Sequence, residues 1–191
     1  MKPINNWNDV QATTDRVKLP NGAYLCRILG AEVRQTKSGN EMLVVSVDIA
    51  EGEYKDYYAT DYRSQNREDK KWRGVVRIFV PTDDGSERDS YTKSNFKAFT
   101  NAVEDSNSGY HWDWNEEGLK GKSIGMLTRN EEWEMNGNTG MSVRPFKLIA
   151  VKRVKDGNFT IPKDKYLNGS APAAQTSSGF TEIPTDDDLP F

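Results

Sequence analysis

Every second residue from Leu43 to Ile49 is a large aliphatic one, which is the two-residue period of a β-strand with one buried face. Burying that face determines the register of any sheet that contains the strand. Residues 22–33 form another run of apolar and β-branched side chains. Residues 37–40, Lys-Ser-Gly-Asn, separate the two runs and are typical of a tight turn. The sequence therefore predicts a long antiparallel hairpin.

Three further strands and one helix are predicted downstream. Residues 75–80 read as a third strand, and residues 122–128 and 143–154 as a fourth and a fifth. Between the third and the fourth strand the apolar period changes to that of a helix over 90–103, with Ser90 as the expected N-cap. The helical face consists of Phe96, Phe99 and Val103.

This order of elements is that of an OB fold, a five-stranded Greek-key barrel with one helix between strands three and four. The expected fold class is accordingly mainly β. Pro145 lies inside the fifth run, and proline cannot donate to a strand ladder, which favours a sheet edge or a bulge there. Residues 136–138, Asn-Gly-Asn, are expected to form the turn before that strand.

The apolar pattern fades after residue 154. We expect residues 1–154 to form the folded domain, 155–180 a flexible linker rich in Gly, Ser, Ala and Pro, and 181–191 an acidic tip. The linker and the tip together make a disordered C-terminal tail in this prediction.

The net charge of −3 belongs to that tail. Residues 155–191 contain three basic and six acidic residues, so residues 1–154 hold 23 of each and are neutral. Net charge alone therefore does not indicate a nucleic-acid partner, and only a local cluster of cations could do so.

The single cysteine and the single histidine limit the chemistry. Cys26 excludes an internal disulfide and a multi-cysteine zinc site, and it lies in an apolar run that predicts burial. His111 alone does not provide a multi-histidine metal cage. We expect no catalytic residue, no metal site and no cofactor. No apolar run reaches the ~20 residues of a membrane helix, and none near Met1 resembles a signal peptide, so a cytoplasmic protein is expected.

Residues 54–77 combine aromatic rings with cations. The segment contains seven basic and four acidic residues, so its net charge is +3. Single-strand binders need cations for phosphates and flat rings on which unpaired bases stack, at ~1–3 kcal/mol per base. The predicted contact residues in this segment are Tyr54, Tyr57, Tyr58, Tyr62, Arg63, Arg67, Lys70, Lys71, Trp72, Arg73 and Arg77. Which of these rings stack on bases, and which pack the barrel, stays open at this point.

Weaker candidates lie outside this segment. They are Lys122, Trp133, Arg144 and Lys147. Trp112 and Trp114 lie among acidic residues, a poor environment for phosphate, and are interpreted as packing residues.

The tip contains Asp186, Asp187, Asp188, Leu189, Pro190 and Phe191. An acidic lead-in, a proline bend and an apolar ring, expected beside a terminal carboxylate, make a compact protein ligand. This ending resembles the tip by which bacterial and phage single-stranded DNA-binding proteins recruit replication, recombination and repair proteins.

The body carries a second resemblance. Its motifs are Asn21-Gly22-Ala23-Tyr24, Ala31-Glu32-Val33, residues 36–43, Glu51-Gly52-Glu53-Tyr54 and residues 118–122. They look like an uncharacterised phage family found in replication and recombination gene clusters. The chain as a whole resembles phage-encoded single-stranded DNA-binding proteins of the OB-fold type. The resemblance implies coating and protection of single strands in the cytoplasm of a bacterial host, and no chemical turnover. The homotetramer of the bacterial protein is not implied, which leaves a homo-oligomer open.

Two alternatives remain. A metal-dependent nuclease or resolvase would need converging carboxylates, for which Asp83-Asp84 and Glu131-Glu132 are the dense acidic pairs of the body. A replisome adaptor would keep the tip and use the barrel to bind protein.

Overall fold

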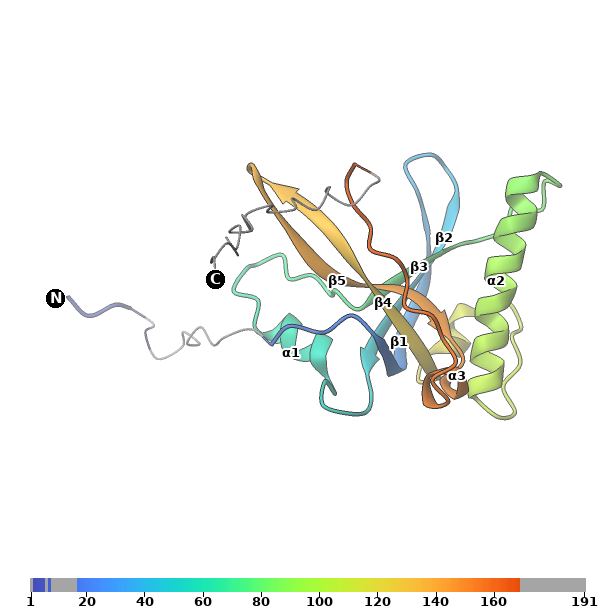
Figure 1. Ribbon diagram of the computed structural model, residues 1–191, viewed down its shortest axis with the longest axis horizontal. Helices are drawn as coiled ribbons and strands as arrows, with labels where there is room; N and C mark the ends of the chain where they lie inside the picture. The colour runs from blue at the N-terminus through green and yellow to red at the C-terminus, as the bar shows by residue number, and fades with distance from the viewer. Residues whose placement is uncertain (1, 6, 8–16, 169–191) are drawn as a thin grey trace, which may run out of the picture.

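The computed structural model describes residues 2–5, 7 and 17–168 of the chain. This part is mainly β, and its five strands form one antiparallel sheet in the order β3-β2-β1-β4-β5 (Figure 1). The strands are β1 (Ala23–Gln35), β2 (Glu41–Ile49), β3 (Val75–Phe79), β4 (Ser123–Met135) and β5 (Asn138–Ile149). The mainly β class and the number of strands predicted from the sequence are confirmed.

Strands β1 and β2 form the predicted hairpin. Their register pairs Val33 with Leu43 and Ile28 with Val47, with an irregularity beside Leu29. The predicted aliphatic face of β2 is buried throughout, which explains why the alternation in the sequence located this strand correctly.

Strands β4 and β5 form a second, longer hairpin around Asn136 and Gly137, both of which have positive φ. The register shifts between Leu127 and Thr128, where Thr128 pairs with Pro145, so the predicted bulge at this proline is confirmed. The expectation that the last strand continues to residue 154 is wrong. The strand ends at Ile149, and the short helix α3 (Val151–Lys155) follows it.

The hydrogen-bonded sheet is not a closed barrel. Its end strands β3 and β5 approach each other in space, but the strand pairing found in the described residues does not join them. The closed five-stranded barrel expected from the sequence is therefore not what these strands form.

Helix α2 (Glu87–Ser106) lies between β3 and β4 in the chain, as predicted, and it packs at one end of the sheet, opposite α1 (Tyr57–Arg63) (Figure 1). The predicted apolar face of Phe96, Phe99 and Val103 is buried. The expected N-cap at Ser90 is wrong, because the hydroxyl of Ser86 accepts the hydrogen bond from the Asp89 N–H at 3.1 Å.

Both tryptophans after α2 were predicted to pack, and only Trp112 packs against the core. Trp112 is half-buried and meets Phe96 edge-on, with ring centroids 5.9 Å apart. Trp114 is 71% exposed, although its ring stacks on that of Phe96 with nearly parallel planes.

The core between the sheet and its helices is aliphatic. Among its fully buried side chains are Ile28, Leu43, Val47, Ile124 and Met126. Cys26 is buried with them as predicted, and burial raises the pKa of its thiol far above the usual value. No helix of the described part of the chain is long and apolar enough to span a membrane.

Helix α1 was not predicted, and its first turn is capped from another element. Its own N-cap residue, Asp56, makes no side-chain cap hydrogen bond. The buried carboxylate of Asp48 on β2 instead accepts from the N–H groups of Tyr58 at 2.9 Å and Ala59 at 3.0 Å. It also accepts from the N–H of Ile49 at 2.9 Å. Asp48 thus does for α1 what an N-cap side chain ordinarily does.

Replacing Gly74 with alanine is expected to destabilise the fold. A Cβ at this position would lie 2.3 Å from the carbonyl oxygen of Val47 and 2.6 Å from the ring of Tyr58. Relieving these clashes requires backbone movement, at a cost of about 1–3 kcal/mol in the free energy of unfolding. Urea denaturation measures this loss. Gly30→Ala is the matched control, because nothing lies within 4 Å of its added Cβ. Equal midpoints for both variants would contradict the prediction.

Replacing Asp48 with asparagine is expected to loosen α1. The amide cannot accept from all three N–H groups, and its NH₂ group would face a donor. We expect a loss of about 1–3 kcal/mol in the free energy of unfolding and faster amide hydrogen exchange over residues 57–63. Asp56→Asn removes the same charge from an exposed position without a cap hydrogen bond and should stay within about 0.5 kcal/mol of the parent protein. Protection of α1 that is unchanged in Asp48→Asn would show that the carboxylate does not anchor the helix.

Candidate nucleic-acid interface

Four aromatic rings from α1 and the loop after it form a continuous row. Their order is Tyr57, Tyr58, Trp72 and Tyr62, and we call them the ring row. Successive ring centroids lie 5.2, 6.5 and 5.9 Å apart. Helix α1 places Tyr58 and Tyr62 one turn apart on one side, which is why the two rings flank the same tryptophan. The structure thus brings together four of the five rings predicted in this segment.

The exposure of the rings changes along the row. Tyr58 is only 3% exposed, and Tyr57 and Trp72 are half-buried. The indole N–H of Trp72 donates to the carbonyl oxygens of Val47 at 3.2 Å and Gly74 at 3.1 Å, which holds its ring against β2. Tyr62 is 38% exposed and rests against Trp72. Tyr62 is therefore the ring with a face open to a ligand, and Trp72 supports it.

Tyr54 lies outside the row and packs against the core. Its ring meets Tyr24 edge-on at 6.0 Å, and the Tyr24 hydroxyl donates to the carbonyl oxygen of Pro20 at 2.6 Å. Burial, followed by the neighbouring tyrosines, raises the pKa of Tyr24 to about 12. Of the two uses that the sequence left open for Tyr54, the structure favours packing.

One cation lies against the exposed end of the row, and others lie on the same loop. The ammonium nitrogen of Lys70 lies 5.9 Å from the Tyr62 ring centroid and donates to the carbonyl oxygen of Arg63 at 3.3 Å. Arg67 and Lys71 both pair with Asp69, at 3.7 and 3.5 Å. Arg63, Arg67, Lys70 and Lys71 are all exposed.

A buried carboxylate organises the loop between α1 and β3. Asp61 pairs with Arg73 at 3.4 Å and accepts from the amide of Gln65 at 3.2 Å. The oxygen of the same amide accepts from the Lys71 N–H at 2.9 Å. These bonds hold the loop that presents the cations beside Tyr62.

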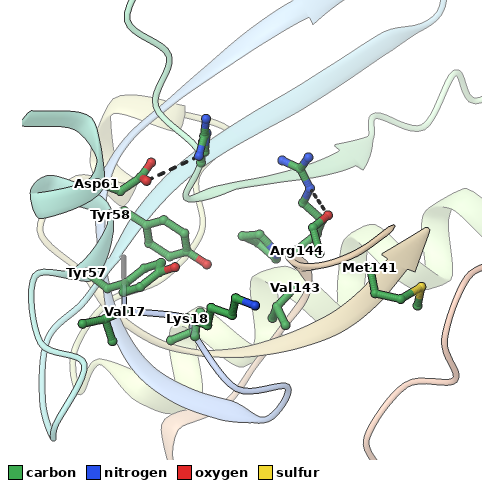
Figure 2. Close-up of a pocket in the computed structure, with 12 residues that line it drawn as sticks. Val17, Lys18, Tyr57, Tyr58, Asp61, Met141, Val143 and Arg144 are labelled. Carbon is green, nitrogen blue, oxygen red and sulfur yellow. Dashed lines mark hydrogen bonds and ion pairs between the residues drawn. The ribbon is translucent and has the colours of Figure 1, made fainter. Parts of the chain in front are cut away.

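A groove of about 320 Å³ lies between α1 and the beginning of β5. Figure 2 shows Tyr57 and Tyr58 on one wall, with Val143 and Arg144 on the other and Lys18 below. Its lining consists of Val17, Lys18, Leu19, Tyr57, Tyr58, Asp61, Arg73, Met141, Ser142, Val143, Arg144 and Pro145. The groove continues from the buried end of the ring row.

One wall of the groove holds a hydroxyl without a partner. Among the described residues, the buried Tyr58 hydroxyl has no hydrogen-bond partner. Burial raises the pKa of this hydroxyl far above its usual value, so it keeps its proton near neutral pH. It remains able both to donate and to accept a hydrogen bond.

The other predicted contact residues lie apart from the row. The ammonium nitrogen of Lys122 lies 4.4 Å from the ring centroid of Tyr110, a residue of the loop after α2. Trp133 covers Gly140 near the end of the β4–β5 hairpin. Arg77 is exposed on β3 and Lys147 on β5. The sequence could not separate these residues from the row, because it shows residue types and not directions.

The acidic pairs of the body have local partners. Asp84 accepts from the N–H of Ser86 at 2.9 Å and from the hydroxyl of Thr82 at 3.0 Å, as expected of a turn. Glu131 pairs with Arg129, and Glu132 accepts from the N–H of Leu167 at 3.0 Å. In the part of the chain that the structure describes, no three His, Cys, Asp or Glu side chains form a group suited to a metal ion.

The predicted linker begins as an ordered segment. Lys165 bridges to Glu131 on the edge of β4 that faces away from β5, with backbone bonds of 2.8 and 2.9 Å. The chain is described up to residue 168, and the predicted partner-docking residues 186–191 lie outside the described residues.

Sequence reasoning missed most of the groove. Tyr57, Tyr58 and Arg73 were predicted contact residues. On β5 only Arg144 was named, as a weaker candidate, and Lys18 and residues 141–143 were not predicted. Lys18 carries no distinguishing signal in the sequence. Residues 141–145 of β5 are far from α1 in the sequence, and only the folded sheet brings the two together.

One comparison with known proteins bears on this region. The family described as "Protein of unknown function (DUF669)" matches residues 6–75. The match spans the β1–β2 hairpin, α1 and the whole ring row, and it ends at the first residue of β3. Among curated proteins, none matches this chain significantly. The ring row thus lies in a segment similar to that family, whose description names no activity.

Proposed function

We propose that the protein binds single-stranded DNA without strong sequence preference, using the ring row and the cations beside it. The observation that carries this proposal is the exposed face of Tyr62, backed by Trp72 and flanked by Lys70. An unpaired base offers a π-face whatever its identity, and stacking contributes ~1–3 kcal/mol per base.

The cations would bind the phosphates of the strand. Arg67 and Lys71 share Asp69 as an exposed partner, and an exposed ion pair is worth only about 0–1 kcal/mol. A phosphate can therefore displace Asp69 at little cost. Arg63 and Lys70 are both exposed, and the Lys70 ammonium donates to the backbone carbonyl of Arg63.

The sheet supports this proposal as an open variant of the OB fold. Its strand order, the approach of β3 and β5, and the position of α2 between β3 and β4 are those expected of that fold. OB folds bind strands beside the face of strands two and three and the neighbouring loops. The ring row lies in the connection between β2 and β3.

The biological setting that we propose rests on the resemblances of the sequence. The protein would coat and protect single strands during phage DNA replication, recombination and repair in the host cytoplasm. Residues 186–191 would recruit replication or recombination proteins. Binding and release of a strand require no chemical turnover.

The alternative that the protein is a nuclease is tested by incubating it with labelled single strands and Mg²⁺ or Mn²⁺. Cleavage of the strands would indicate a catalytic role in place of the binding role. An adaptor that binds only protein is tested by oligonucleotide titration. Neutralised phosphates release counterions, so strand affinity must fall steeply as the salt concentration rises.

Replacing Tyr62 with alanine is expected to weaken binding of oligo(dT) about tenfold, because one stacked base is lost. Fluorescence anisotropy of a labelled oligonucleotide at low and moderate salt measures both the affinity and the salt dependence. Tyr91→Ala is the control, because Tyr91 is an even more exposed ring, on α2 at the other end of the sheet. Absence of binding at low salt would refute the proposed function, and equal losses in both variants would refute the role of Tyr62.

The acidic tip is expected to compete with DNA for the cationic surface. The opposite charges of the tip, with its three aspartates, and of residues 54–77, with a net charge of +3, favour this competition. Deleting residues 182–191 should tighten oligonucleotide binding at low salt. Removing Phe191 alone should abolish partner binding and leave DNA affinity nearly unchanged. Unchanged or weaker DNA binding after the deletion would show that the tip does not occupy this surface.

A further inference from the structure

The groove beside the ring row has the size of a single-nucleotide site. Its volume of about 320 Å³ is at the lower end of the range for small-molecule sites. It lies between Tyr57 and Tyr58, at the buried end of the ring row, and the β5 wall (Figure 2).

The charge of the groove suits a phosphate. Lys18, Arg73 and Arg144 line it, and the one lining carboxylate, Asp61, is already paired with Arg73 at 3.4 Å. The Nε–H of Arg144 donates to the hydroxyl of Ser142 at 3.1 Å, which orients its guanidinium on the β5 wall. Exposed guanidinium nitrogens are well matched to phosphate oxygens.

The remaining walls suit a base. Val143 lies across the groove from Tyr57 (Figure 2), and Met141 and Pro145 add apolar surface to the lining. The Tyr58 hydroxyl is the one buried polar atom of the lining without a hydrogen-bond partner among the described residues. Buried polar groups ordinarily have hydrogen-bond partners, so this hydroxyl indicates a ligand that would supply the missing partner.

We propose that this groove receives one nucleotide of the bound strand, with its base beside Tyr57 and its edge hydrogen-bonded to the Tyr58 hydroxyl. The inference rests on the proposed function and adds to it a base preference at one position per bound protein. The exposed ring of Tyr62 contributes affinity for any base, whereas the groove distinguishes between bases.

The test compares equal-length oligonucleotides of dT, dC and dA on the full chain and on Tyr58→Phe. The parent protein should prefer one base about five- to tenfold, the effect of one hydrogen bond. Tyr58→Phe should abolish that preference while its thermal stability is unchanged or higher, because an unpaired buried hydroxyl is removed. Tyr110→Phe is the matched control, since Tyr110 also has a buried hydroxyl without a partner among the described residues, on the loop after α2. It should keep the preference.

Photo-cross-linking of an oligonucleotide that contains 5-iododeoxyuridine gives a second readout. A cross-link to Tyr57 supports the inserted nucleotide, and cross-links confined to Tyr62 contradict it. Equal affinity of the parent protein for all three oligonucleotides, or a preference that survives in Tyr58→Phe, overturns the inference and leaves the proposed function standing. Absence of any oligonucleotide binding overturns both. If Tyr58→Phe weakens only the binding of a synthetic peptide of residues 182–191, the groove is a protein-docking site instead.

Discussion

The Asp48 carboxylate on β2 accepts hydrogen bonds from the N–H groups of Tyr58 and Ala59 in the first turn of α1. A helix of seven residues is unstable in isolation, and α1 has no cap of its own. Its position therefore depends on this carboxylate and on the packing of Tyr58 beneath it. Burial raises the pKa of Asp48, although its three N–H donors oppose that shift. The ring row and one wall of the groove are built on α1, so both depend on the same contact.

The sequence predicted the two hairpins and α2 because each has a clear period and a recognisable turn. It missed α1 because that helix is short and its capping acid lies on a preceding strand. No local pattern links Asp48 to Tyr58. The last strand was predicted too long, since Val151 and Val154 continue the apolar character of β5 after the backbone has turned into α3. Closure of a barrel is equally non-local, because it depends on how the end strands meet.

The sequence predicted which residue types make up the candidate site, but not how their side chains are arranged. The cluster of rings and cations in residues 54–77 does come together around α1. Which ring faces solvent depends on two contacts invisible in the sequence: the close approach of Gly74 to Tyr58 and the bonds from the Trp72 N–H to backbone carbonyls. The groove needs, in addition, a wall from β5, far along the chain. Local composition therefore located the site, and long-range packing determined its shape.

Burial assigns different chemistry to tyrosines of one short helix. Tyr62 presents the face of its ring, and a π-face is common to every base, so contact with it cannot discriminate. Tyr58 presents no face, because Trp72, Gly74 and Tyr57 cover its ring, and its hydroxyl points toward the groove (Figure 2). Hydrogen bonds to base edges are the interactions that distinguish bases. Affinity for any strand and selectivity at one nucleotide can therefore arise from the same residue type, separated by a single helical turn.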